Sequence, residues 1–404
     1  MVAALLVLNP LVVYLVSGSR SLAAFSLLLD AWLAGAIAGG LWYLGRRRRA
    51  GLWLMAGFIG TLLPALVAGE VLLTWLRHQH ADRLLGEVAD IYVPDPELVY
   101  AHVPEARGRH ASLGNFDVEY VIDAAGRKAI PEDPKAERTI HVFGDSFTFG
   151  YGVANEETWL NRLKARLGTE ANVLNYGVVG YSIEQMLLRL ARSTEQIEAG
   201  DLVVFAPVAA DLERSLVGKS YVCGGLIRAE ENEHFPKYED GRWRQARLRD
   251  ECNFLLDTVL ANSPLPVGFG AVWRELGRNA RHPEMIANAD RLFAEAERLA
   301  AERGASFHVV FLATPEECAR GAHDFEIEPL ATEYASFLPF CPDDPEAVQA
   351  LKFPYDGHWS AAGHSWAADV IYEILQELPD PADPARVAQR AEPQPASTEP
   401  SDTP

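Results

Sequence analysis

The residues most capable of covalent chemistry lie at two places far apart in the sequence. Ser146 stands in the segment HVFGDSFTFGYG, where an apolar run ends at Gly-Asp-Ser and becomes rich in glycine. A serine hydroxyl is a weak nucleophile on its own and needs a neighbouring base. His358 and Asp356, in the segment DGHW, supply an imidazole and a carboxylate that can orient it. Ser146 is therefore a nucleophile if folding unites these groups, and otherwise the polar residue of a tight turn.

Strands and helices alternate along the part of the chain that carries these residues. We expect buried strands at residues 138–143, 172–177, 201–207 and 306–313. Helices are expected from about Asn155 as N-cap, from Ser182 with a capping box to Gln185, across 289–304 and across 360–378. This alternation predicts an α/β domain with a parallel sheet covered on both faces.

The loops that carry the polar residues follow the predicted strands. Ser146 follows the first strand, residues 177–180 follow the second, and residues 209–211 follow the third. Residues 356–359 immediately precede the last helix. Ligands of open parallel sheets bind beyond the carboxyl ends of the strands. We therefore expect these four loops to converge on one rim.

Three blocks in this order, GDSFTFGYG, NYGVVGYS and DGHWSAAGH, resemble the SGNH/GDSL hydrolases, and the resemblance covers about residues 138–378. It implies a flavodoxin-like three-layer sandwich with a parallel sheet. It also implies a hydrolase that cleaves esters with Ser146 as nucleophile, His358 as base and Asp356 as the orienting acid. Neither a metal ion nor a cofactor is expected.

The third block departs from the usual family spacing. The family pattern is Asp-x-x-His, whereas Asp356 and His358 form Asp-x-His followed by Trp359. This shorter form resembles that of alginate O-acetyltransferase-type members. In those proteins the Asp-x-His block precedes the serine, so only the local motif is shared.

The oxyanion side departs further from the family. The resemblance implies donors from the amide of Ser146, from the amide of a glycine in the second block, and from an asparagine after the third strand. Gly180 matches the glycine best and Gly177 second, but Ala210 occupies the asparagine position. One lost oxyanion donor costs about 3 kcal/mol of transition-state stabilisation. Two amides suffice, or Asn175 or Arg214 stands in, or the site is degenerate.

Four other residues near these blocks need an interpretation. We expect His364 to pack or cap the last helix rather than act as the base, and Asp211 to hydrogen-bond within its loop. Trp359 either lines an acyl or sugar pocket or belongs to the core. His308, in the middle of a strand, is expected to be structural.

Three apolar stretches occupy the first 80 residues, at 2–17, 22–45 and 52–76. The second and third are long enough to cross a bilayer, whereas the first is a short span, an interfacial segment or a signal-like region. Four consecutive arginines at 46–49 place the loop between the last two stretches in the cytoplasm. We therefore expect two or three transmembrane helices in an inner membrane, with everything after residue 80 in the periplasm or outside the cell.

Asp30 and Glu70 interrupt two of these stretches. At 1.5 Å per residue they lie about 12 Å and about 9 Å from the outer ends of their spans. Intramembrane acids are costly and often functional. The two carboxyl groups either share a proton or dock a basic partner residue, or they lie close enough to the interface to be hydrated.

The soluble part of the chain is strongly acidic. The whole chain carries a formal charge of −20, and residues 1–80 carry +4, which leaves −24 for the remainder. This charge excludes a nucleic-acid binder and favours neutral or cationic substrates over anionic ones.

All four cysteines lie in the part expected outside the cytoplasm, where disulfides persist. Pairing of nearest neighbours would join Cys223 to Cys252 and Cys318 to Cys341, and each loop would contribute about 3 kcal/mol. Four cysteines allow three connectivities, and the sequence does not choose among them. No two of them have the close spacing of a zinc site.

The remaining segments complete the domain organisation. Residues 1–80 form the transmembrane region, 81–137 a linker with a short β element, and 138–378 the hydrolase-like domain. Residues 215–280 form an insertion that shapes the pocket. The tail at 379–404 has seven prolines and no aromatic residue, so we expect it to be disordered.

Three functions fit these observations. The first is a membrane-anchored serine esterase acting on O-acyl groups, such as acetyl esters of cell-envelope glycans. The second is an O-acyltransferase that modifies an exported polysaccharide and takes its acyl group from a membrane partner protein. The third is a non-catalytic scaffold on a weakened hydrolase fold, a hypothesis that the alanine at position 210 motivates.

Overall fold

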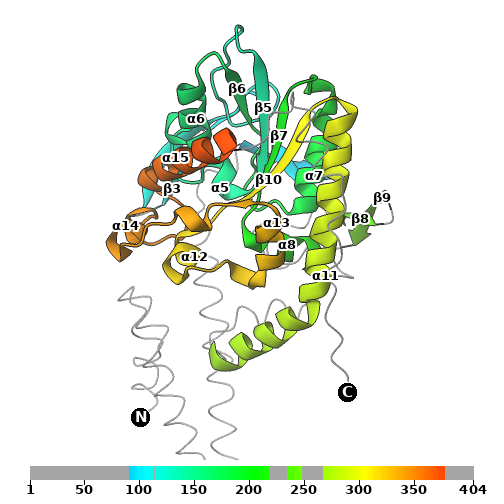
Figure 1. The fold of residues 1–404 in the computed structure, drawn as a ribbon, viewed down its shortest axis with the longest axis vertical. Coiled ribbons are helices and arrows are strands. Elements are labelled where there is room, and N and C mark those ends of the chain that lie inside the picture. The colour runs from blue at the N-terminus through cyan, green and yellow to red at the C-terminus, as the bar shows by residue number, and fades with distance from the viewer. Residues whose placement is uncertain (1–90, 113, 218–233, 240, 248–266, 378–404) are drawn as a thin grey trace, which may run out of the picture. The chain divides into compact units, whose positions relative to one another are not determined.

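The computed structural model describes residues 91–112, 114–217, 234–239, 241–247 and 267–377 (Figure 1). The contacts divide the chain into two units, and the second, residues 87–251 and 282–404, contains all the candidate catalytic residues. The expectations for residues 1–80, for the pair Cys223 and Cys252, and for the tail lie outside the described residues. Within the described ranges, no helix has the length and apolar character that crossing a membrane requires.

A five-stranded sheet forms the centre of the second unit. Its strands are β5 (Arg138–Gly144), β6 (Ala171–Asn175), β7 (Leu202–Ala206), β10 (Ser306–Phe311) and β11 (Ala335–Ser336). They are ordered β11-β10-β7-β5-β6, and the recorded pairings are parallel. Counted along the chain this order is 2-1-3-4-5, which confirms the flavodoxin-like α/β fold. The topological switch point lies between β5 and β7, where such sheets bind ligands.

Helices cover both faces of this sheet, as Figure 1 shows. Helices α6 (Trp159–Leu167) and α15 (Ala361–Glu377) lie on one face, and α7 (Ile183–Ser193) and the part of α11 (Val267–Glu302) from Met285 onward lie on the other. Side chains of strand β5 pack against the helices on both faces, because successive side chains of a strand point to opposite sides. Ile140 and Val142 belong to the α6 and α15 side, whereas Phe143 belongs to the α7 and α11 side. Each such buried side chain contributes about 1.5–3 kcal/mol.

The start of α6 differs from the prediction that Asn155 is its N-cap. Asn155 begins a short 3-10 turn, η2 (Asn155–Glu157), and Thr158 caps α6 by accepting the N–H of Asn161. The Asn155 side chain instead binds the backbone N–H and C=O of Val121. It thus ties the preceding strand to the domain. The capping box from Ser182 to Gln185 at α7 is confirmed.

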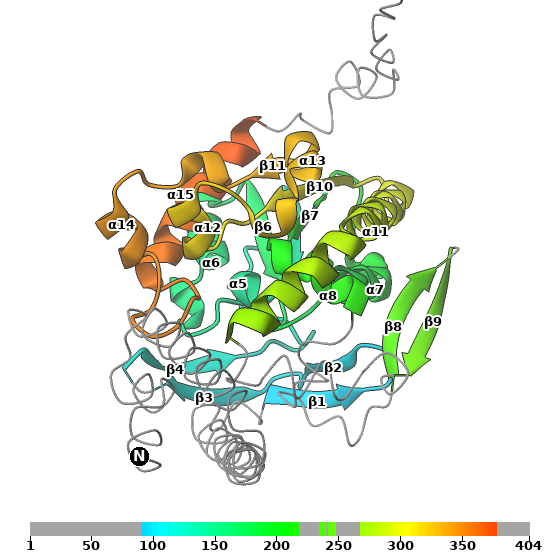
Figure 2. The same ribbon diagram turned by 90° about the horizontal axis from the view of Figure 1, so that it is seen from below.

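Three antiparallel hairpins occur among the described residues in addition to the sheet. They are β1 (Tyr92–Asp95) with β2 (Val99–His102), β3 (Arg107–Ser112) with β4 (Phe116–Val121), and β8 (His234–Glu239) with β9 (Arg242–Arg247). The first two lie together along one end of the unit (Figure 2). Tyr120 and Ile122 pack there against Phe149, which follows the candidate nucleophile closely. The short β element is therefore packed against the segment that carries Ser146.

The remaining helical elements are short. They are α5 (Ser146–Phe149), η3 (Thr194–Gln196), α8 (Ala209–Val217), α12 (Pro315–Arg320), η5 (Asp324–Glu326), α13 (Glu328–Glu333), η6 (Leu338–Phe340) and α14 (Pro345–Ala350). Helix α11 begins at Val267, well before the expected residue 289, so part of the expected insertion is helix. The two-residue strand β11 was not predicted, because two residues show no periodicity.

Candidate active site

Ser146, His358 and Asp356 form a continuous hydrogen-bonded chain. The Ser146 Oγ lies 2.8 Å from His358 Nε2, although the two residues are 212 positions apart. His358 Nδ1 lies 2.6 Å from Asp356 Oδ1, which also accepts the backbone N–H of His358 at 2.8 Å. Folding thus brings together the three side chains expected to act together. This is the arrangement in which a serine can be deprotonated by a neighbouring imidazole.

The Gly-Asp-Ser turn is shaped by the end of β5. A Cβ on Gly144 would lie 2.0 Å from Thr148 Oγ1 and 2.9 Å from the carbonyl oxygen of Ala206, so only glycine fits. Asp145 caps α5 by accepting the N–H of Phe147 at 2.9 Å. Ser146 is the first residue of that helix and is 2% exposed. Its hydroxyl is therefore held in one place by local structure.

Asp356 and His358 are each about a quarter exposed at the side chain, at 24% and 25%. Burial raises the pKa of Asp356, but the hydrogen bonds and the charge of His358 outweigh it and hold the pKa below its usual value. Asp356 is consequently ionised at neutral pH. An ionised carboxylate accepts the Nδ1–H proton, so the lone pair of Nε2 faces Ser146.

The candidate oxyanion donors have different surroundings. The N–H of Gly177 donates to Asn175 Oδ1 at 2.9 Å, and Asn175 Nδ2 donates to the carbonyl oxygen of Thr148 at 3.0 Å. Both groups therefore serve the local structure, which speaks against Gly177 and Asn175 as oxyanion donors. Gly180 has a φ of 78°, which suits glycine. Neither its N–H nor that of Ser146 donates to another of the described residues.

Arg214, the other candidate stand-in, belongs to a buried charge cluster beside the nucleophile. Its Nη1 donates to Asp145 Oδ2 at 3.1 Å, to the carbonyl oxygen of Tyr181 at 3.2 Å, and to Asp211 Oδ1. Asp145 Oδ2 also lies 3.3 Å from Ser146 Oγ. Burial, followed by the charge of Asp145, raises the pKa of Asp211 well above its usual value. The cluster is thus one hydrogen bond away from the attacking oxygen.

Two further side chains take the positions that packing dictates. His364 is 1% exposed, and its Nδ1 accepts the N–H of Trp159 at 3.4 Å. Burial lowers the pKa of His364 well below its usual value, so it stays neutral. Trp359 is fully buried and stacks on Phe337 with ring centroids 6.0 Å apart. Of the two interpretations of Trp359, the structure supports the core residue.

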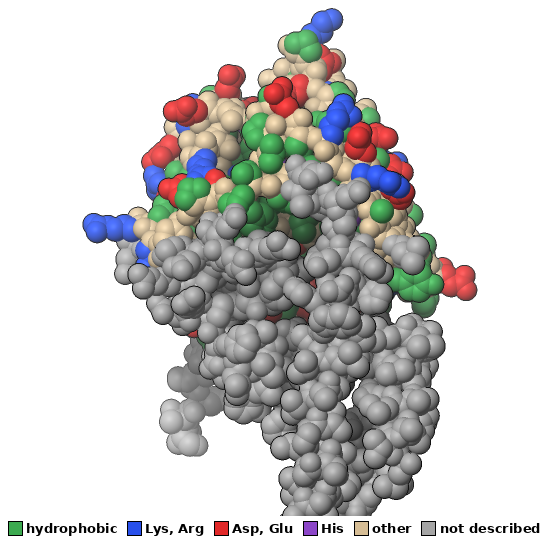
Figure 3. Space-filling view, turned by 180° about the vertical axis from the view of Figure 1, so that it is seen from behind, with side chains coloured by type: hydrophobic (Ala, Val, Ile, Leu, Met, Phe, Trp, Pro, Cys, Tyr) green, Lys and Arg blue, Asp and Glu red, His purple; other side chains and the backbone are tan. Residues whose placement is uncertain are grey.

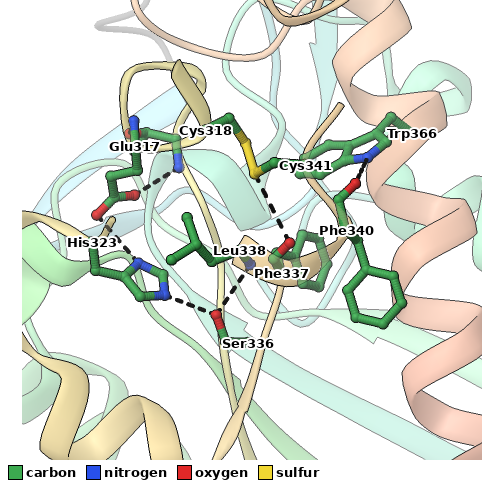
Figure 4. The surroundings of a disulfide bond; sticks show 10 residues. Glu317, Cys318, His323, Ser336, Phe337, Leu338, Phe340, Cys341 and Trp366 are labelled. Atoms are coloured by element: carbon green, nitrogen blue, oxygen red, sulfur yellow. Dashed lines mark hydrogen bonds and ion pairs between the residues drawn. A yellow bond between two sulfur atoms is a disulfide. The ribbon is translucent and has the colours of Figure 1, made fainter. Parts of the chain in front are cut away.

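A disulfide bond links α12 to the segment after η6 (Figure 4). Cys318 of α12 is bonded to Cys341, which follows η6. Phe337, just before η6, stacks on Trp359, and Trp366 Nε1 donates to the carbonyl oxygen of Phe340 at 3.1 Å. The bridge therefore joins segments that pack next to the loop of His358.

Sequence reasoning missed the contribution of the β3–β4 hairpin to the site. His110 and Phe116 of this hairpin contact the ring of Tyr151, whose centroid lies 4.4 Å from that of His358. Asn115 Oδ1 accepts the N–H of Tyr355, next to Asp356, at 2.9 Å. The alternating pattern of the hairpin reveals strands, but it carries no signal for what they pack against.

Comparisons with known proteins place these observations beside solved structures. No family model and no curated protein matches the sequence. A lipolytic protein of the G-D-S-L family from Veillonella parvula is 14% identical, with 60% of this chain and 100% of that chain covered and a TM-score of 0.34. The psychrotrophic esterase EstA from Pseudoalteromonas is 12% identical, with 60% and 98% covered and a TM-score of 0.33. The carbohydrate acetylesterase Est24 from Sinorhizobium meliloti is 13% identical, with 59% and 99% covered and a TM-score of 0.32.

The names of these solved structures describe a GDSL-family lipolytic protein, an esterase and a carbohydrate acetylesterase. The identities are low, so what the site does chemically follows from its own side chains and their geometry.

Proposed function

We propose that this protein is a serine esterase of the SGNH/GDSL type that hydrolyses O-acyl esters. The observation that carries the proposal is the chain of hydrogen bonds from Ser146 through His358 to Asp356, 2.8 Å and 2.6 Å long. Such a chain both deprotonates the nucleophile and stabilises the imidazolium that results. It also argues against the scaffold hypothesis, because a retired site has no need of a connected triad.

The reaction proceeds in two displacements. Ser146 Oγ attacks the ester carbonyl carbon while its proton passes to His358 Nε2, which gives a tetrahedral adduct. The amides of Ser146 and Gly180 are the proposed donors to its oxyanion. The imidazolium then protonates the leaving alcohol, so the acyl group remains on Ser146. Water, deprotonated by His358, attacks this acyl-enzyme, and the carboxylic acid and free serine are released.

Labelling and turnover of a small ester test the proposal directly. The full-length protein should react with a fluorophosphonate at Ser146 and hydrolyse p-nitrophenyl acetate. Ser146→Ala should abolish labelling and lower kcat by about 10⁴-fold or more. Ser193→Ala, a serine at the end of α7, is the matched control and should retain both activities. Folded wild-type protein that neither reacts nor turns over would refute the proposal.

A glycan is the proposed carrier of the ester. Tyr355, adjacent to Asp356, is 75% exposed, and its ring packs on Gly114, where a Cβ would lie 3.0 Å away. A tyrosine ring with one face supported offers a rigid apolar surface of the kind that packs on a sugar ring. The net charge of −24 beyond residue 80 disfavours polyanionic chains. Figure 3 shows acidic and basic side chains interspersed on one face of the described part.

Comparison of two substrates tests this assignment. Tyr355→Ala should lower kcat/KM for an O-acetylated oligosaccharide by about tenfold and leave kcat/KM for p-nitrophenyl acetate unchanged. Tyr355→Phe, which keeps the ring, should behave as the wild type on both substrates. Equal losses on both substrates would show that Tyr355 supports the site rather than the sugar.

We also propose that residues 1–80 anchor the chain in an inner membrane, with the catalytic domain in the periplasm or outside the cell. The apolar stretches, the arginine loop at 46–49 and the disulfide of Cys318 support this orientation. Reporter fusions after residues 47 and 85 test it. A phosphatase that needs an oxidising compartment should be active only in the second fusion, and the reverse pattern would invert the topology.

The same acyl-enzyme would support transfer to a sugar hydroxyl instead of water. The Asp-Gly-His-Trp segment, which resembles that of alginate O-acetyltransferase-type proteins, favours this second function. It would require a membrane partner protein as acyl donor. Incubation with an acyl donor in the presence of oligosaccharide distinguishes the two, because transfer yields an acylated sugar and hydrolysis yields only the free acid.

A further inference from the structure

The imidazole of His358 has two aromatic rings in contact with it. The centroid of Phe147 is 5.0 Å from that of His358 with the planes inclined by 33°, and the centroid of Tyr151 is 4.4 Å away with an inclination of 34°. Both pairs are tilted, with their planes nearer to parallel than to perpendicular, so each aromatic ring turns part of its face toward the imidazole. Both distances fall within the range in which a ring face attracts a cation.

His358 becomes a cation only during the reaction. In the resting chain of hydrogen bonds the imidazole accepts at Nε2, and it gains a positive charge when the proton of Ser146 arrives there. A ring face carries the negative part of the aromatic quadrupole. The attraction between Tyr151 and His358 is therefore stronger in the transition state than before it, which is the condition for catalysis.

The β3–β4 hairpin holds Tyr151 in this position. His110 meets the Tyr151 ring edge-on at 4.9 Å and 74°, and Phe116 meets it at 5.4 Å and 83°. His110 Nδ1 is itself hydrogen-bonded to the Tyr120 hydroxyl at 2.9 Å, and that hydroxyl accepts the N–H of Gly152 at 2.7 Å. The hairpin thus packs against the Tyr151 ring and binds the backbone of the next residue, Gly152.

We propose that Tyr151 is a positioning residue that stabilises the imidazolium form of His358 through its ring face, with the β3–β4 hairpin as its support. The inference rests on the esterase function proposed above. It assigns a task to a hairpin that precedes the three sequence blocks, and it explains why that hairpin packs so closely on the segment after the nucleophile.

The other titratable groups that face His358 should not obscure its protonation in a pH profile. Asp356 lies on its own loop, and its lowered pKa keeps it ionised over the relevant range. Burial lowers the pKa of His110, on β3, to about 4, and burial lowers that of His364, on α15, well below its usual value. Both histidines therefore favour their neutral forms, and a neutral His110 does not repel an imidazolium at His358.

The pH profile of kcat/KM tests the proposal with Tyr151→Leu and Tyr151→Phe in the full-length protein. Hydrolysis needs neutral His358, so the acid limb of the profile reports its protonation. Loss of the ring face should lower the plateau about tenfold and move the acid limb to lower pH by about half a unit or more. Tyr151→Phe keeps the face and should retain both the plateau and the limb. A lowered plateau with an unmoved limb in Tyr151→Leu would mean a merely structural role and overturn the proposal.

A second series does not depend on whether the leucine variant folds. Phenylalanine at position 151 is replaced by analogues with one, two and three ring fluorines, which weaken the quadrupole with little change in shape. The plateau should fall in steps with fluorine number, and a flat response would overturn the proposal. Titration of the His358 ring protons by NMR in Ser146→Ala should show the same steps. Because this readout needs no turnover, it separates failure of this inference from failure of the esterase function.

Discussion

Among the aspartates connected to the nucleophile through hydrogen bonds, Asp356 and Asp211 have surroundings that drive their pKa values in opposite directions. Asp356 reaches Ser146 through His358 and is about a quarter exposed. Its pKa is lowered, because the contacts with His358 outweigh the effect of burial. Asp211 reaches Ser146 through Arg214 and Asp145 and is fully buried. Its pKa is raised, first by burial and then by the charge of Asp145.

The opposite pKa shifts indicate which of the two carboxyl groups acts in catalysis. An acid that remains ionised can compensate a positive charge that forms and disappears on His358 during each cycle. Burial raises the pKa of Asp211 instead, and its carboxyl group accepts the N–H of Val208 at 3.0 Å and contacts Arg214. Proximity to the nucleophile alone therefore does not mark the catalytic acid. The catalytic acid is identified by the partner that its carboxyl group contacts.

The largest expected effect comes from replacing the ionised member. Asp356→Asn should lower kcat for p-nitrophenyl acetate by about 10³- to 10⁴-fold, because the amide no longer fixes the imidazole tautomer or compensates its charge. Asp211→Asn, the same substitution at the fully buried member, should leave kcat within about threefold of the wild type. Steady-state kinetics of both variants measure the contrast, and comparable losses would erase the distinction between the two acids.

Removing the cation of the buried cluster should have the largest effect on stability. Arg214→Met leaves Asp145 and Asp211 without their shared partner in a site where both are fully buried. Breaking a buried ion pair by removing one member costs about 3–5 kcal/mol. Urea unfolding of the full-length chain, followed by near-ultraviolet circular dichroism, measures the loss. Arg298→Met, at a surface ion pair with Glu295, is the control and should leave the urea midpoint close to that of the wild type.

Breaking the disulfide should reduce local stability around His358 and Trp359 more than at the buried cluster of Asp145, Asp211 and Arg214. Replacing both Cys318 and Cys341 by alanine should cost about 3 kcal/mol in unfolding free energy, since the bridge closes a loop of 23 residues. Hydrogen exchange should become faster around Trp359 and remain unchanged at β5. Uniform acceleration in both regions would mean that the bridge stabilises the unit as a whole.

The smallest expected effect is a difference in pH dependence. A group whose folded pKa is raised contributes stability below its unfolded pKa and loses it as the pH rises. The free energy of unfolding of Asp211→Asn should therefore increase relative to that of the wild type between about pH 4 and pH 7. A group whose folded pKa is lowered contributes stability above its unfolded pKa and loses it as the pH falls. Asp356→Asn should therefore lose most relative to the wild type near pH 7 and least near pH 3.

Urea midpoints at several pH values give both curves. Trends of the same sign in the two variants would contradict the opposite surroundings described for the two aspartates.

Much of the fold and the triad could be predicted from local patterns. The alternation of buried strands and helices predicts the parallel sheet, and the capping box at Ser182 marks the start of α7 correctly. The Gly-Asp-Ser turn can be recognised in the sequence, because the strand end, the helix cap and the glycine that it needs are all local features. Asn155 was misassigned as an N-cap, because its partner, Val121, comes from a strand 34 positions earlier. No local pattern records such a contact.

What the sequence by itself determined is the order of strands and helices, the turn that presents Ser146, and the residue types that can act on an ester. The tertiary structure alone decided that Gly177 and Asn175 bond to neighbours, that Arg214 joins two buried acids, and that a hairpin places Tyr151 against His358. The physical reason is range. Backbone preference and side-chain periodicity act over a few residues, whereas burial, charge pairing and ring contacts depend on which distant segments the fold brings together.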